Sequence, residues 1–138
     1  MTVSKVKETT KHFTVYLVAD GVYAAIANQG TGAMANAGFV DTGESVVVFD
    51  SMNTQQAAAE LRQVATVLTG KPISHLINSH WHGDHVRGNQ AFRDVDIVAS
   101  NQTRELMQEI HPARIAKQQT GIQEFKDYVL HSKQNAGS

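Results

Sequence analysis

Three histidines and one aspartate lie within six consecutive residues of this chain, and this cluster constrains the fold more than any other feature. The cluster directly follows an apolar segment, residues 73–78, which predicts a buried strand. His80 and His82 are two residues apart, so on an extended backbone both side chains leave the same side and can converge on one ion. The glycine that follows lets the backbone turn and directs Asp84 and His85 towards a neighbouring position. The spacing therefore predicts a loop that serves two metal ions.

The residue types also indicate which metals the loop would bind. Neutral imidazoles and a carboxylate suit Zn²⁺, and also Fe or Mn. The chain has no cysteine, which excludes thiolate zinc sites, disulfides and thiol catalysis. A site with few protein ligands keeps a position open for water, and a divalent cation lowers the pKa of that water to about 7. We therefore expect one or two zinc ions at a hydrolytic site; the alternative is a surface loop that binds no metal.

Composition limits the other possibilities. The chain has 138 residues, of which 41% are hydrophobic and 18% charged, so we expect one globular domain over residues 1–138 with flexible ends at 1–11 and 133–138. Lys and Arg number 12 and Asp and Glu 13, with no basic cluster, so nucleic acid is not an expected partner. The apolar runs are too short for a membrane span. We expect a soluble protein of the cytoplasm or periplasm that acts on a small-molecule substrate.

Alternating apolar residues and turn residues predict six strands before and around the metal loop. The expected strands cover residues 12–19, 22–28, 37–41, 45–50, 73–78 and 95–99. This order, several strands first and then strand and helix in alternation, indicates an α+β fold. Its sheet should be covered by helices on one face, which leaves the other face in need of a partner.

Residues 53–68 predict a helix that lies on this sheet. Asn53 is the expected N-cap, with Gln56 three residues further on, and Gly70 should end the helix. The residues expected to face the sheet recur at helical spacing: Ala57, Leu61, Val64, Ala65 and Leu68. From residue 101 onward the pattern is again helical, with a break expected near His111 and Pro112.

The His-x-His-x-Asp-His motif after an apolar strand, preceded by residues 38–40 and 46–50, resembles the metallo-β-lactamase superfamily over about residues 12–110. The resemblance implies half of an αββα sandwich with a mainly antiparallel or mixed sheet. It further implies that His80 and His82 bind one zinc ion, and that Asp84 and His85 bind the second. Asp84 would also help to orient a bridging hydroxide. The implied reaction is attack of a metal-bound hydroxide on an ester, thioester, amide or lactam bond, with the substrate left open.

Three further residues each allow two interpretations. By resemblance, Asp50 at the end of a predicted strand would hold the imidazole of a metal ligand; the alternative is an ordinary turn aspartate at a strand end. Trp81 either flanks the substrate or packs against the sheet. Arg87 either contacts an anionic substrate group or is solvated.

Enzymes of this superfamily are longer, and their second half supplies the remaining metal ligands. The only histidines after His85 in this sequence are His111 and His131, and both lie within helical patterns. The chain therefore resembles the N-terminal half alone, and its activity should be incomplete. It could be a fragment, a natural half-protein that forms a homodimer through the exposed sheet face, or a catalytically inactive half-domain that serves as a metal-binding or dimerisation module.

Residues 30–35 match Gly-x-Gly-x-x-Ala after a strand, which superficially resembles a dinucleotide fingerprint. Hairpin signals occupy the positions where the required helix would begin, so this interpretation is not favoured. A loosely packed, mobile loop near the active site is expected instead, because two glycines and small side chains offer little to pack.

Overall fold

A computed structural model describes residues 2–136 of the chain. The chain forms two compact units, Met1–Arg104 and Glu105–Ser138. The first unit carries the sheet and the histidine loop, and the second consists of most of one long helix. Each unit is described by itself.

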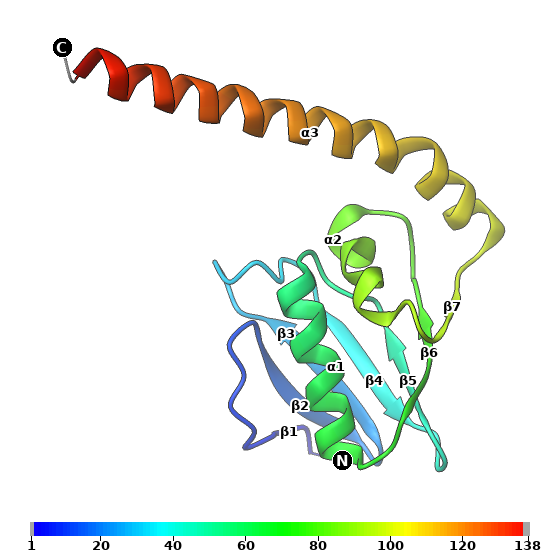
Figure 1. Cartoon of the computed structure of the whole chain (residues 1–138). Helices are drawn as coiled ribbons and strands as arrows, with labels where there is room; N and C mark the ends of the chain where they lie inside the picture. The colour runs from blue at the N-terminus through cyan, green and yellow to red at the C-terminus, as the bar shows by residue number, and fades with distance from the viewer. Residues whose placement is uncertain (1, 137–138) are drawn as a thin grey trace. The chain divides into compact units, whose positions relative to one another are not determined.

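Seven strands of the described chain form one sheet, in the order in which they occur in the sequence (Figure 1). They are β1 Ser4–Lys5, β2 Phe13–Ala19, β3 Val22–Ala27, β4 Ala37–Asp41, β5 Val46–Phe49, β6 Ile73–Ile77 and β7 Asp96–Val98. Neighbours from β1 to β5 are antiparallel, whereas β5, β6 and β7 are parallel. The expected α+β fold with a mixed sheet is therefore confirmed.

The six predicted strands are present, and each end lies within one residue of the predicted position. The hairpin between β2 and β3 turns at Gly21, whose φ of 70° lies in the left-handed region that suits glycine. Strand β1 was not predicted because its two residues are polar and show no alternation. It joins the sheet through backbone pairing, with Ser4 opposite Leu17.

Helix α1 (Gln55–Thr69) begins one residue later than the sequence predicts. The N-cap is Thr54, whose hydroxyl accepts a hydrogen bond from the Ala57 amide at 3.2 Å. The expected cap, Asn53, is wrong because its side chain instead accepts a hydrogen bond from Arg87. Gly70 ends the helix in the left-handed conformation, with a φ of 67°, as predicted.

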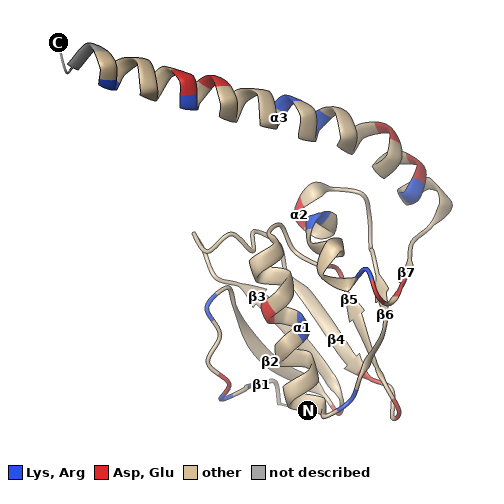
Figure 2. Cartoon of the chain, in the orientation of Figure 1, with Lys and Arg blue, Asp and Glu red and all other residues tan. Residues whose placement is uncertain are grey.

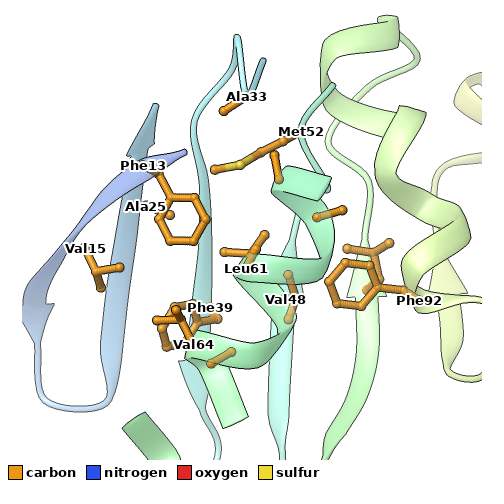
Figure 3. Packing of buried hydrophobic residues seen from close by; sticks show 14 of the residues in the cluster. Phe13, Val15, Ala25, Ala33, Phe39, Val48, Met52, Leu61, Val64 and Phe92 are labelled. Carbon is orange, nitrogen blue, oxygen red and sulfur yellow. The ribbon is translucent and has the colours of Figure 1, made fainter. Parts of the chain in front are cut away.

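The core lies between α1 and one face of the sheet (Figure 3). Leu61 is fully buried, Val64 is buried, and Leu68 packs at the margin of the core, so the predicted inner face of the helix is confirmed. The largest buried side chains from the rest of the unit include three phenylalanines: Phe13, Phe39 and Phe92. Side chains alternate between the two faces of a strand. Strands β3, β5 and β7 therefore present Ile26, Phe49 and Val98 on the face opposite α1, where each is 40% to 46% exposed.

Helix α1 also contacts the 3-10 helix η1 (Arg87–Phe92), which follows the histidine loop. Arg62 on α1 donates to the carbonyl of Ala91 at 2.8 Å and to the carboxylate of Asp94 at 2.6 Å. This guanidinium also lies 5.6 Å from the centre of the Phe92 ring. Its hydrogen bonds lower the pKa of Asp94 to about 2, and the pair anchors the exit of the loop to the helix.

Helix α3 (Asn101–Ala136) is preceded by Ser100, whose hydroxyl accepts a hydrogen bond from the Thr103 amide at 3.1 Å. The predicted break near Pro112 is wrong, because the helix continues through this proline. Proline removes one backbone hydrogen bond, and the helix-forming residues on both sides sustain the rest. Of the ends expected to be flexible, residue 1 and residues 137–138 lie outside the described residues. No described helix is long and apolar enough to cross a membrane.

We predict that Leu61→Ala destabilises the sheet-bearing unit by about 2 to 5 kcal/mol, because it removes a fully buried side chain and leaves a cavity. Val67→Ala is the matched control, since Val67 lies on the same helix and is 58% exposed. Its effect should stay within about 0.5 kcal/mol. Urea denaturation followed by circular dichroism measures both variants, and equal stabilities would contradict the packing of α1.

Candidate metal centre

The histidine loop begins where the parallel strands β5 and β6 end side by side. Phe49 and Ile77 are partners in the register of these strands, so the residues that follow them emerge at the same edge of the sheet. The backbone of Asp50 extends this pairing, because its amide donates to the carbonyl of Ile77 at 2.9 Å. Residues that are about thirty positions apart in the sequence are thereby brought into contact.

The carboxylate of Asp50 joins these two strand ends. Its Oδ1 accepts from the backbone amide of Ser79 at 2.7 Å, and its Oδ2 accepts from the Ser79 hydroxyl at 2.6 Å. The same Oδ2 lies 2.8 Å from Nδ1 of His85. Asp50 is 7% exposed and has a φ of 62°, an uncommon conformation that aspartate tolerates better than most residues. The geometry places Asp50 against an imidazole of the motif.

These contacts set the orientation of two imidazole rings. Nδ1 of His80 lies 2.8 Å from the Ser79 hydroxyl, which in turn donates to Asp50. Asp50 is therefore linked to Nδ1 of His85 directly and to Nδ1 of His80 through Ser79. If both Nδ1 atoms carry the proton, as an acceptor on that side favours, both Nε2 atoms keep a lone pair for a cation.

Among the described residues, Asp50, His80 and His85 form a group of potential metal ligands. One ligand atom from each residue can be chosen so that all lie within 4.8 Å of one another, and the ring centres of the two histidines are 4.2 Å apart. Two imidazoles and a carboxylate are ligands that zinc prefers. The donor set therefore fits the metal that the sequence predicts.

The other two motif residues lie beside this group. The His82 ring is 4.6 Å from the His80 ring, and Oδ2 of Asp84 is 3.8 Å from Nε2 of His85. The backbone bends at residues 79–81 and then forms one helical turn, α2 (Gly83–Val86). The predicted sharing of the four residues between two ions stays a prediction. The Trp81 ring lies 4.7 Å from that of His82.

Sequence reasoning missed the polar network behind the loop. The Ser51 amide donates to the carbonyl of His85 at 2.9 Å, and its hydroxyl donates to Oδ1 of Asn89 at 2.8 Å. The side chains of Asn78 and Asn89 exchange two hydrogen bonds of 3.0 and 2.7 Å. Asn89 thus ties both strand ends to the segment after the loop. No local pattern identifies these residues, since their partners become neighbours only in the folded sheet.

Gly88 is the position at which the loop comes closest to the rest of the unit. A Cβ atom there would lie 1.9 Å from the carbonyl oxygen of Ser51 and 2.5 Å from Cβ of Ala58. No side chain fits in this space. A glycine is therefore required for the loop to pack on the start of α1.

The loop between β3 and β4 is better packed than its composition predicts. Ala33 is fully buried, Ala35 is 7% exposed, and the carbonyl of Ala33 accepts from the Asn53 amide at 3.1 Å. Its small side chains fit into the core beside α1, so the expectation of a loosely packed loop is wrong. Met34 between them is 70% exposed, with a φ of 63°.

The stretch that contains the histidine loop matches known proteins. A model of the metallo-β-lactamase superfamily matches residues 30–100, about half of the chain, including the whole ligand cluster. A linear primary-alkylsulfatase from a Pseudomonas species is 36% identical over 70 residues, which are 51% of this chain and 12% of the relative. The chain therefore spans a small part of that relative's length.

Three solved metallo-β-lactamases share the fold. The enzyme from Erythrobacter litoralis superposes with a TM-score of 0.66 at 18% identity and covers 77% of this chain. The enzyme from Hirschia baltica superposes with a TM-score of 0.63 at 23% identity and covers 72% of this chain. The mono-zinc form of an enzyme from Pseudomonas aeruginosa gives 0.63, at 17% identity and 75% coverage. This chain spans 48%, 48% and 49% of the three structures. The family model and the fold together show that the chain belongs to the metallo-β-lactamase superfamily.

Proposed function

We propose that this chain provides the metal centre of a metal-dependent hydrolase that acts on an ester, thioester, amide or lactam bond. The observation that carries the proposal is the convergence of His80 and His85, whose ring centres are 4.2 Å apart, beside the buried carboxylate of Asp50 at the ends of two parallel strands. Catalytic zinc is held by such donors, with a position left for water or substrate.

The residues of the loop would divide the work. His80 and His85 would bind the ion through Nε2, while Asp50 holds the opposite side of each ring, directly or through Ser79. His82 and Asp84 would bind a second ion beside it, and Asp84 would also orient the attacking water. A divalent cation at this position supplies water activated at neutral pH and polarises the bond to be cleaved.

The relative's name adds one substrate class to the candidates. The matched Pseudomonas protein is a linear primary-alkylsulfatase, so sulfate esters of primary alcohols belong in the first substrate screen. The low coverage of that relative leaves this as one class among several.

The alternative function is a metal-binding or dimerisation module without catalysis. It is favoured by the apolar side chains Ile26, Phe49 and Val98, which remain exposed on the sheet face opposite α1. A homodimer through this face would cover them. Metal content and mass in solution separate the two: bound zinc with turnover supports the hydrolase, whereas a stable dimer without turnover supports the module.

We predict that the 138-residue chain binds zinc with a dissociation constant above about 1 µM as a monomer. The motif offers each of two ions two protein ligands, whereas a catalytic zinc usually has three. Calorimetric titration at neutral pH, together with the mass in solution, tests this. A submicromolar site in a monomer would show that further residues complete the coordination.

We predict that Asp50→Asn weakens zinc binding by about 10- to 100-fold, because the carboxylate that holds His85 is lost. Asparagine tolerates the left-handed backbone at this position, so the fold should survive. Asp20→Asn is the control, since Asp20 is exposed at the β2–β3 turn. Calorimetry compares the variants, and an unchanged affinity would remove Asp50 from the metal centre.

A substrate screen tests the reaction itself. Generic ester, thioester, phosphodiester and lactam substrates and a primary alkyl sulfate are assayed with and without Zn²⁺. We expect turnover to be low in the monomer, to require the metal and to disappear in His82→Ala. Hydrolysis that survives both chelation and this substitution would exclude the proposed mechanism.

A further inference from the structure

We propose that Arg87 binds the anionic group of the substrate, a sulfate, phosphate or carboxylate next to the bond that is cleaved. This inference rests on the proposed function and names the substrate class of the same site. The proposal is carried by the position of the Arg87 guanidinium, its hydrogen bonds and its lack of an acidic partner among the described residues.

The guanidinium of Arg87 lies against the histidine loop. A Cβ atom on Gly83 would be 2.7 Å from Nε, 2.8 Å from Cζ and 2.9 Å from Nη2 of this arginine. Gly83 stands between His82 and Asp84, two residues of the metal motif. The absence of a side chain at Gly83 is what leaves room for the cation beside them.

Two contacts hold Arg87 in this orientation. Its Nη1 donates to Oδ1 of Asn53 at 2.9 Å, and its backbone carbonyl accepts from Nε2 of Gln55 at 2.6 Å. The backbone of Asn53 is itself fixed, since its amide donates to the carbonyl of Ala33. The side chain is therefore positioned before any ligand arrives, which lowers the entropy cost of binding.

Arg87 differs from the other anchored cations of the sheet-bearing unit. Arg62 pairs with Asp94 and Lys71 pairs with Asp41, whereas no carboxylate of the described residues lies within 4.0 Å of Arg87. Figure 2 shows acidic and basic positions close together at α2. In the sequence, this stretch and the residue after it contain Asp84 and Arg87. The charge of Arg87 thus remains available for an anion from outside the chain.

The unused donors of Arg87 are also accessible. A guanidinium has five N–H donors, and the bond to Asn53 uses one of them. Within the described part of the chain, no buried side-chain nitrogen or oxygen lacks a hydrogen-bond partner. Any Arg87 donor without a partner therefore reaches solvent. Its planar fork matches two oxygens of a sulfate, phosphate or carboxylate.

The test measures binding of methyl sulfate to the full chain by NMR titration, with and without zinc. Dimethyl sulfone is the neutral probe of similar shape. We expect methyl sulfate to bind more tightly than the sulfone, and Arg87→Met to weaken methyl sulfate binding by about 10- to 100-fold. Arg87→Lys keeps the charge without the fork and should fall between the two. Arg93→Met, which changes an exposed arginine at the end of η1, should bind like the original chain.

Equal affinity of the original chain and Arg87→Met for methyl sulfate would overturn the inference, as would equal affinity for the two probes. Zinc titration of each variant separates this result from the proposed function. If the original chain binds no zinc, the hydrolase proposal fails, and the zinc-free titrations still test Arg87. If Arg87→Met binds zinc normally but loses methyl sulfate, the arginine has the proposed role. If Arg87→Met does not fold, a loss of affinity in Arg87→Lys supports the inference, and unchanged affinity there contradicts the fork as the binding element.

Discussion

The carboxylate of Asp50 accepts hydrogen bonds from the backbone and hydroxyl of Ser79 and contacts Nδ1 of His85. Through these contacts, one buried acidic group fixes the start of the histidine loop and a residue near its end. The left-handed backbone of Asp50 costs roughly 1 to 2 kcal/mol. The three polar contacts of this buried carboxylate can offset a cost of that size. The orientation of both imidazoles follows from this arrangement.

That carboxylate reaches the loop because of the sheet behind it. Parallel pairing brings the ends of β5 and β6 together, α1 covers the sheet next to them, and Gly88 lets the loop pack on the start of α1. Arg62 then fixes the segment that leaves the loop. The sheet, α1 and the segment that leaves the loop therefore fix the positions of the metal-binding side chains, as a metal site requires.

The sequence alone predicts the elements well and their contacts less well. Periodicity and turn residues identify six strands and α1, and Gly70 marks where that helix ends, because these signals are local. Thr54 rather than Asn53 is the cap because Asn53 accepts a hydrogen bond from Arg87, and Ala33 packs beside the start of α1; both contacts join residues that are distant in the sequence. The same holds for the ligand cluster. The motif names the histidines, but the links from Asp50 through Ser79, and those made by Asn89, exist only once distant strands are paired.

The proposed centre has His80 and His85 bound to one metal ion at this strand edge. Zinc K-edge X-ray absorption of the zinc-loaded chain tests it most directly, because imidazole ligands give a characteristic scattering pattern with zinc–nitrogen distances of about 2.0 Å. We expect at least two imidazole ligands in the original chain and one fewer in His85→Ala. A zinc ion surrounded by oxygen ligands alone, or a spectrum unchanged in His85→Ala, would contradict it.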